Sequence, residues 1–196
     1  MAGPRDEADA MQSLIKAAEA AEREGSGLPP VERWHPEHCG RMDMVIRRDG
    51  SWWHEGTRIT REPLIRLFSR ILRKDEDGKT YLVTPVEQIE IEVEAAPFIA
   101  VRMEATGAGE DQRIAFATNF DEMVVAGPDH PIRVEIDASS GEPEPFVHVR
   151  ARLDALMTRA VFYELAEHAV EGEGPGGEPV MGVWSRGVFF PLGPKR

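Results

Sequence analysis

An Asp-Gly pair at positions 49–50 lies between two runs of β-forming residues, and it constrains the fold more than any other local feature of the chain. Both residue types reach positive φ angles at low cost, as the tightest hairpin turns require. The segment 42–59, MDMVIRRDGSWWHEGTRI, is therefore predicted to be strand, turn and strand. Because neighbouring strand residues point to opposite faces, Trp52 and Trp53 cannot both be buried in one core.

Most of the segment 86–136 also has the pattern of β-strands. In QIEIEVE, at 88–94, apolar and acidic residues alternate with a period of two, which is typical of a strand with one wet face. Further apolar runs follow, separated by Gly, Asn, Asp and Pro turns. This half of the chain is predicted to be a β-rich lobe.

Three segments have the period of a helix. The first is 6–24, followed by the linker GSGLPP. The second begins near Thr60 and is predicted to end at Gly78. The third is predicted over 150–169, since its apolar residues recur at i, i+3, i+4, i+7 and i+8; they are Leu153, Leu156, Met157, Ala160 and Val161.

The order strand, turn, strand, helix, loop, strand occurs twice, over about 42–84 and about 132–184, which suggests a duplication. We therefore predict an α+β fold of two β-rich lobes, each closed by one long helix, plus an N-terminal helix. The predicted parts are 1–28 (helix and linker), 29–84 (N-terminal lobe) and 85–196 (C-terminal lobe with the long helix). Two such lobes would leave a groove between them.

The net charge of −12 argues against partners that are themselves polyanions. We expect neither nucleic acid nor an anionic membrane to bind this chain. The single cysteine, Cys39, is typical of a reducing compartment. With no apolar signal core at the N-terminus and no apolar run long enough to span a bilayer, a cytoplasmic location is expected.

Three long segments resemble the proteobacterial family called domain of unknown function 1285: 39–87, CGRMDMVIRRDGSWWHEGTRITREPLIRLFSRILRKDEDGKTYLVTPVE; 130–167, HPIRVEIDASSGEPEPFVHVRARLDALMTRAVFYELAE; and 182–192, GVWSRGVFFPL. The resemblance covers about residues 28–192. It implies a duplicated β-rich core, a C-terminal lobe like a pleckstrin-homology roll, a ligand groove between lobes for a nucleotide-like molecule, and a role in signalling. It implies no catalytic residues.

Short motifs for cofactors, metals and nucleophiles do not hold in context. The match of GEGPGG, at 172–177, to a dinucleotide loop is in the wrong order, because it follows a helix and precedes a strand. His35, His38 and Cys39 lack the second ligand cluster of a structural zinc site. No G-x-S-x-G elbow, Walker loop or H-E-x-x-H motif is present. We therefore assign no cofactor, no metal and no catalytic residue.

Positive charge is concentrated in one part of this acidic chain. Residues 41–74 hold nine Arg and Lys against four Asp and Glu. Arg66, Arg70 and Arg73 would share one face of the second helix. Arginine forks suit phosphate or carboxylate, so the segment favours an anionic ligand. The alternative is that these arginines pair with the acidic half of the same chain across an interface between the lobes.

The leading hypothesis is a non-catalytic ligand-binding or regulatory protein for a small anionic, nucleotide-like molecule. In the duplication, the junctions near Arg58 and Arg61 would correspond to the one at Arg150. Trp52, Trp53, Phe98 or Tyr163 would supply stacking. The candidate ligand residues are Trp53, Arg58, Arg61, Thr84, Glu87, Arg150, Arg159 and Tyr163.

Two other classes of function stay open on the sequence alone. One is an enzyme acting on a phosphorylated or carboxylated small molecule, with Glu87, His54 or His148 as general acid–base. The other is a protein-interaction scaffold that uses a lobe surface. The oligomeric state is left open.

Overall fold

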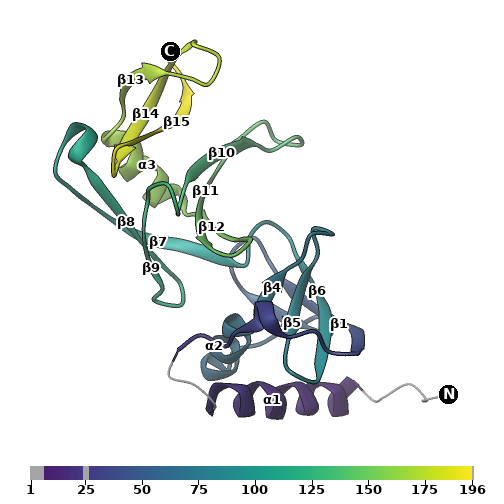
Figure 1. The fold of residues 1–196 in the computed structure, drawn as a ribbon. Coiled ribbons are helices and arrows are strands. Elements are labelled where there is room, and N and C mark those ends of the chain that lie inside the picture. Colours follow the sequence, from purple (N-terminus) through teal and green to yellow (C-terminus); the bar gives the residue numbers. More distant parts are fainter. Residues whose placement is uncertain (1–6, 24–26, 196) are drawn as a thin grey trace. The chain divides into compact units, whose positions relative to one another are not determined.

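The computed structural model describes residues 7–23 and 27–195 (Figure 1). The chain divides into two compact units, Met1–Ala95 and Ala96–Arg196. Each unit is built on its own six-stranded sheet.

The first unit contains a sheet in the order β3-β2-β1-β6-β5-β4, in which β1 and β6 are parallel and the other pairs antiparallel. Its elements are α1 (Glu7–Arg23), the 3-10 turn η1 (Val31–Arg33), β1 (His38–Ile46), β2 (Trp52–His54), β3 (Thr57–Arg58), α2 (Glu62–Arg70), β4 (Leu72–Lys74), β5 (Thr80–Val83) and β6 (Glu87–Val93).

The predicted hairpin is confirmed, with β1 paired to β2, although its turn differs in detail. Gly50 has a φ of 79° and is the residue of the Asp-Gly pair in the left-handed region. The amide of Arg47 donates to the Ser51 carbonyl, so three residues make the loop. Trp52 faces the core, where it is fully buried and its ring centroid lies 6.2 Å from that of Phe68 on α2.

The second unit contains a sheet in the order β10-β11-β12-β7-β8-β9, with β12 and β7 parallel, and a smaller sheet β13-β14-β15. Its elements are β7 (Phe98–Thr106), the 3-10 turn η2 (Gly109–Asp111), β8 (Arg113–Thr118), β9 (Met123–Val125), β10 (Ile132–Ile136), β11 (Pro143–Arg150), β12 (Leu153–Met157), α3 (Arg159–Glu167), β13 (Val170–Glu173), β14 (Pro179–Ser185) and β15 (Val188–Pro194).

The two large sheets share one topology. Adding six to each strand number of the first sheet reproduces the order of the second, including its single parallel pair. The repeat therefore matches β1–β6 with β7–β12, not the hairpin of β1 and β2 with that of β10 and β11. The predicted alignment of the two repeats is wrong. The helix α2 follows the third strand of the first unit, β3, whereas α3 follows the sixth strand of the second unit, β12, so a hairpin followed by a helix does not mark equivalent positions.

The predicted helix over 150–169 is wrong in its first half. Arg150 ends β11, residues 151–152 form a turn in which Ala151 has a positive φ of 48°, and residues 153–157 form the strand β12. The helix α3 begins only after Thr158, whose Oγ1 accepts a hydrogen bond from the Val161 amide at 3.2 Å. The apolar residues of β12 were compatible with both periods, so the N-cap at Thr158 was the better signal.

The second predicted helix also ends earlier than expected. The helix α2 stops at Arg70, and Leu72–Lys74 is the strand β4. Gly78, with a φ of 81°, closes the hairpin between β4 and β5 rather than the helix. Arg73 is therefore not on a helical stripe with Arg66 and Arg70.

The predicted boundary after residue 84 would separate β6 from the strands β1 and β5 that flank it. The compact unit instead runs to Ala95, and thus keeps the whole sheet together. Among the described residues, no helix is long and apolar enough to cross a membrane.

Candidate functional site

The outer face of the first sheet carries a row of side chains across four strands. Trp52 points into the core, so Trp53 points outward. The cross-strand partners are Arg58 with Trp53, Trp53 with Val45, and Val45 with Glu92. Directly opposed residues share a face. The row therefore has a cation at one end, an indole and a valine in the middle, and a carboxylate at the other end.

Trp53 is held in one orientation by its neighbours. Its Nε1 donates to Ser51 Oγ at 2.8 Å, and Ser51 Oγ donates to Asp49 Oδ1 at 2.5 Å. The guanidinium of Arg47 lies 3.9 Å from the ring centroid of Trp53. The hydrogen bonds from Ser51, together with the charges of Arg58 and Arg47, lower the pKa of Asp49, so this carboxylate stays ionised. These contacts hold the indole in one orientation.

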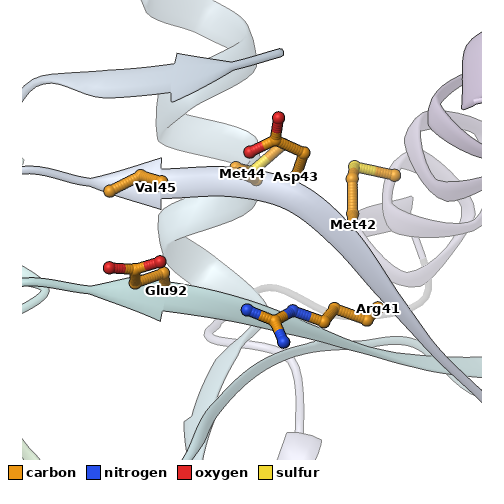
Figure 2. A pocket seen from close by; sticks show the side chains of 6 residues that line it. All are labelled: Arg41, Met42, Asp43, Met44, Val45 and Glu92. Atoms are coloured by element: carbon orange, nitrogen blue, oxygen red, sulfur yellow. The ribbon is translucent and has the colours of Figure 1, made fainter. Parts of the chain in front are cut away.

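A hollow adjoins this row at an irregularity in β1. Arg41 opposes Glu90 and Val45 opposes Glu92, so the three residues 42–44 stand opposite one residue of β6. The hollow is an open cavity of about 330 Å³, lined by Arg41, Met42, Asp43, Met44, Val45 and Glu92 (Figure 2). In Figure 2 the Arg41 side chain extends from β1 along β6 in the direction of Glu92.

The charged side chains around the row are exposed to solvent. The Arg58 side chain is exposed and makes no hydrogen bond or ion pair with any described residue. Asp43 and Glu92 are also exposed, on the side of the hollow. We call the set of Arg47, Trp53, Arg58 and the hollow the outer-face site.

Other predicted ligand residues of the first unit lie elsewhere. Arg61 is exposed at the N-cap of α2. Thr84 is fully buried, and its Oγ1 accepts hydrogen bonds from the amides of Glu87 at 3.1 Å and Val86 at 3.4 Å. Glu87 is also buried, with 3% of its surface exposed. Thr84 thus stabilises the turn between β5 and β6.

The predicted arginines of the second unit bind carboxylates of that unit. Arg150 Nη1 donates to both carboxylate oxygens of Glu122, at 2.9 and 3.1 Å. Arg159 Nη2 donates to Glu142 at 2.8 Å. Tyr163 is 66% exposed on α3. Arg150 and Arg159 are therefore paired with acidic residues of their own unit.

The arginine stripe predicted on the second helix is likewise used within the first unit. Arg70 Nε lies 2.6 Å from Glu22 of α1, and Arg66 Nη2 lies 3.3 Å from Glu62. Arg73 is buried and donates to Asp75, Gln88 and two backbone carbonyls. Arg70 and Arg73 thus connect elements of the first unit to one another, whereas the pair of Arg66 and Glu62 lies within α2.

The candidate acid–base residues do not form one cluster within the first unit. His54 lies opposite Met44 and Glu87 lies opposite His38, six positions apart on β1 and so roughly 20 Å apart. His148, in the second unit, has its Nδ1 3.2 Å from Asp154 Oδ1.

Metal-binding groups were examined among residues whose side chains are described. No three His, Cys, Asp or Glu side chains there gather closely enough to hold a metal ion. Of His35, His38 and Cys39, which the sequence did not support as a zinc site, the side chains of His38 and Cys39 lie outside the described part.

Sequence reasoning missed Arg47, Asp43 and Glu92 as parts of the site. A signal for Arg47 was present, because it lies two positions after Val45, just past the end of β1, and so continues the outward face. Glu92 was read as one of the acidic residues on a wet strand face, and that reading holds. What could not be read was which strand lies beside β6, since β1 and β6 are far apart in sequence.

Comparison with known proteins identifies the relatives of the chain. Residues 29–96 match the N-terminal domain of the family described as domain of unknown function DUF1285, and residues 97–192 match its C-terminal domain. A crystal structure of a DUF1285 family protein from Silicibacter pomeroyi DSS-3 is similar at 44% identity and a TM-score of 0.83, covering 92% of this chain and 94% of that one.

A second crystal structure, of a DUF1285 family protein from Shewanella baltica OS155, has 21% identity and a TM-score of 0.49, covering 65% of this chain and 92% of that one. No curated protein matches the chain.

Proposed function

The chain belongs to the DUF1285 family, and we propose that it is a non-catalytic ligand-binding protein whose outer-face site takes a small anionic, nucleotide-like molecule. The single observation that carries this proposal is the fixed indole of Trp53, with Arg47 over its ring and Arg58 directly beside it. An aromatic surface next to an exposed guanidinium favours ligands with a planar part and an anionic part.

The order of groups along the row supports a specific orientation of the ligand. Phosphate would lie against Arg58, where a planar guanidinium can donate two hydrogen bonds. A base would stack near Trp53. The sugar of a nucleotide lies between its phosphate and its base, so it would lie between Arg58 and Trp53. The N–H groups of the base would then donate to the carboxylates of Glu92 and Asp43, which can only accept hydrogen bonds when ionised. Three strand spacings separate Arg58 from Glu92, about 14 Å, which is the scale of a mononucleotide.

A regulatory role is the part of the proposal that follows from this chemistry. A protein that binds an anionic metabolite without converting it can report its concentration to a partner. The roll-like character of the second unit belongs to the same proposal, supported by six strands followed by the single helix α3. A cytoplasmic location would give such a protein access to nucleotides.

The test is calorimetry of the full chain with three probes: adenosine 5′-monophosphate, ribose 5-phosphate and adenosine. We expect the nucleotide to bind more tightly than either fragment. Arg58→Gln should weaken nucleotide binding about 10- to 100-fold, because a hydrogen bond to a charged group contributes about 1.5–3 kcal/mol. Trp53→Leu should weaken binding of the nucleotide but not of ribose 5-phosphate.

The matched control is Arg102→Gln, which removes an exposed arginine of the second unit that has no described partner. This variant should bind as the parent does. Nucleotide binding that Arg58→Gln and Trp53→Leu leave unchanged would refute the outer-face site. No binding of any probe at millimolar concentration would refute the proposed ligand class.

A further inference from the structure

The strand β10 is the edge of the large sheet in the second unit, and one side of its backbone is open. The amide of His148 donates to the Pro131 carbonyl, and that of Asp137 donates to Glu142. Odd-numbered residues of β10 therefore turn their peptide groups toward β11, and the even-numbered ones turn theirs away. In the described part of the chain, nothing pairs with the peptide groups of Ile132, Val134 and Ile136 on that open side.

An apolar groove accompanies this open edge. It lies between β10 and β15, which belong to different sheets of the same unit (Figure 1). Its volume is about 600 Å³, and its apolar lining includes Ile132, Val134, Ile136, Val180, Pro191 and Pro194. Ile136 is 66% exposed although it lies in a strand. An exposed, apolar, unpaired edge is a template for another strand.

We propose that the occupant is β10 of a second copy of this chain. The strand reads Ile132-Arg133-Val134-Glu135-Ile136, so its apolar and charged residues are symmetric in position about Val134 and opposite in charge. In an antiparallel pair centred on Val134, each Arg133 faces Glu135 of the second copy. Each Ile132 faces Ile136 of the second copy. The contact is thus the self-complementary kind that a two-fold dimer uses.

The charged pair is positioned for this exchange. The side chains of Arg133 and Glu135 are 43% and 55% exposed, and Arg133 Nε lies 2.7 Å from Glu135. Arg133 Nη1 also lies 2.9 Å from Asp154 Oδ2. Arg133 would therefore keep an ion pair within its own chain when Glu135 pairs with Arg133 of the second copy. Opposite charges across a strand pair are favourable, and like charges there are destabilising.

The backbone supplies most of the specificity for register. With Val134 at the centre, the outward peptide groups of Ile132, Val134 and Ile136 all meet outward groups of the second copy. A slip by one residue would place inward-turned peptide groups and wrong side chains in the contact. Five residues span only about 17 Å, so the interface is small and the dimer should dissociate on dilution.

Sedimentation velocity of the full chain, from about 1 µM to about 1 mM, covers the affinities that a small interface gives. Val134→Pro removes an amide that faces away from β11, so it deletes the donor to the second copy without deleting a bond inside the sheet. Glu135→Arg places arginine opposite Arg133 of the second copy. Glu104→Arg makes the same charge change at an exposed position of β7 and serves as the control.

We expect the sedimentation coefficient of the parent to rise with concentration toward that of a dimer. Val134→Pro and Glu135→Arg should raise the dissociation constant at least about tenfold, while Glu104→Arg should not, since one lost charge-assisted contact is about 1.4 kcal/mol or more. Circular dichroism checks that each variant is folded. If Val134→Pro does not fold, Glu135→Arg and concentration-dependent hydrogen exchange at Val134 in the parent still decide the question.

Three results would overturn the proposal. The parent could stay monomeric throughout the range. It could form a dimer that Glu135→Arg and Val134→Pro leave unchanged, which would put the contact elsewhere. Or amide protection of β10 could require an added extended peptide rather than a second copy, which would assign the groove to a different partner.

Discussion

Replacing Arg73 tests whether its buried side chain stabilises the first unit through the hydrogen bonds described above. Its side chain is 6% exposed and makes a fork with Asp75, at 2.6 and 3.1 Å. It also donates to Gln88 at 2.8 Å and to the carbonyls of Val31 and Trp34, at 2.9 and 2.7 Å. The guanidinium thus ties the segment before β1 to the strands β4 and β6.

The magnitude follows from these contacts. Removing one partner of a buried ion pair costs about 3–5 kcal/mol, because the other groups lose their partner without regaining water. We expect this loss of unfolding free energy for Arg73→Met. Arg73→Lys keeps the charge, but an ammonium cannot reproduce the planar fork, so about half of that loss is expected.

Urea unfolding followed by tryptophan fluorescence measures the effect. Three of the four tryptophans, Trp34, Trp52 and Trp53, lie in the first unit. With a slope of about 1–2 kcal/mol per molar urea, Arg73→Met should lower the midpoint by at least about 1.5 M. Arg102→Met, at an exposed position without a described partner, should change the free energy by less than about 0.5 kcal/mol. If both variants unfold at the same urea concentration, the structural role assigned to Arg73 is refuted.

Two further outcomes are expected. Tyr81 donates to Asp77 at 2.6 Å, and this hydrogen bond raises the pKa of Tyr81 to about 12; its stabilising contribution is complete below the ordinary value of 10.0 and is lost as the pH rises toward 12. In a Tyr163→Phe variant, where Tyr81 is the sole tyrosine, the absorbance titration should have its midpoint near 12, and a midpoint near 10 would contradict the assignment. A methyl group at Gly182 would overlap atoms of β15, so Gly182→Ala should destabilise the second unit by about 1–3 kcal/mol, whereas Gly193→Ala, which meets open space, should melt like the parent.

The parts of the fold predicted from sequence are those that local chemistry decides. Gly50 fixes a hairpin turn, and the alternation over 88–94 fixes the wet and dry faces of β6. The opposite facing of Trp52 and Trp53 also followed from the strand alone, and burial shows that Trp52 is the inner one. What the sequence could not decide was strand order, because β1 and β6 are neighbours through pairing between distant segments.

The errors in the predicted helices have one physical origin. In 153–157 every second residue faces one way as a strand, yet Leu153, Leu156 and Met157 also fit a helical stripe. Short apolar segments satisfy both periods, so tertiary pairing decides between them. The same ambiguity led to the prediction that Arg73 lies on a helix. It is a residue of β4, and its side chain donates hydrogen bonds within the first unit.

The structure brings only some of the predicted site residues together, for a related reason. Trp53 and Arg58 come together because they oppose each other across a short hairpin, which the sequence could indicate. Arg150 and Arg159 instead form ion pairs with Glu122 and Glu142 of their own unit. Such pairings depend on which loops meet in space and leave no local signature.

The parallel pair of first and last strands in each six-stranded sheet has a consequence for how the chain folds. The first strand of each sheet cannot complete its pairing until the sixth is available, so the contact that closes each six-stranded sheet joins segments far apart in sequence. Such contacts slow folding, because the intervening chain must be ordered first. During synthesis the first unit can close once β6, ending at Val93, has emerged from the ribosome, before any strand of the second unit has emerged. Because the two units divide after Ala95, each can fold without strands from the other.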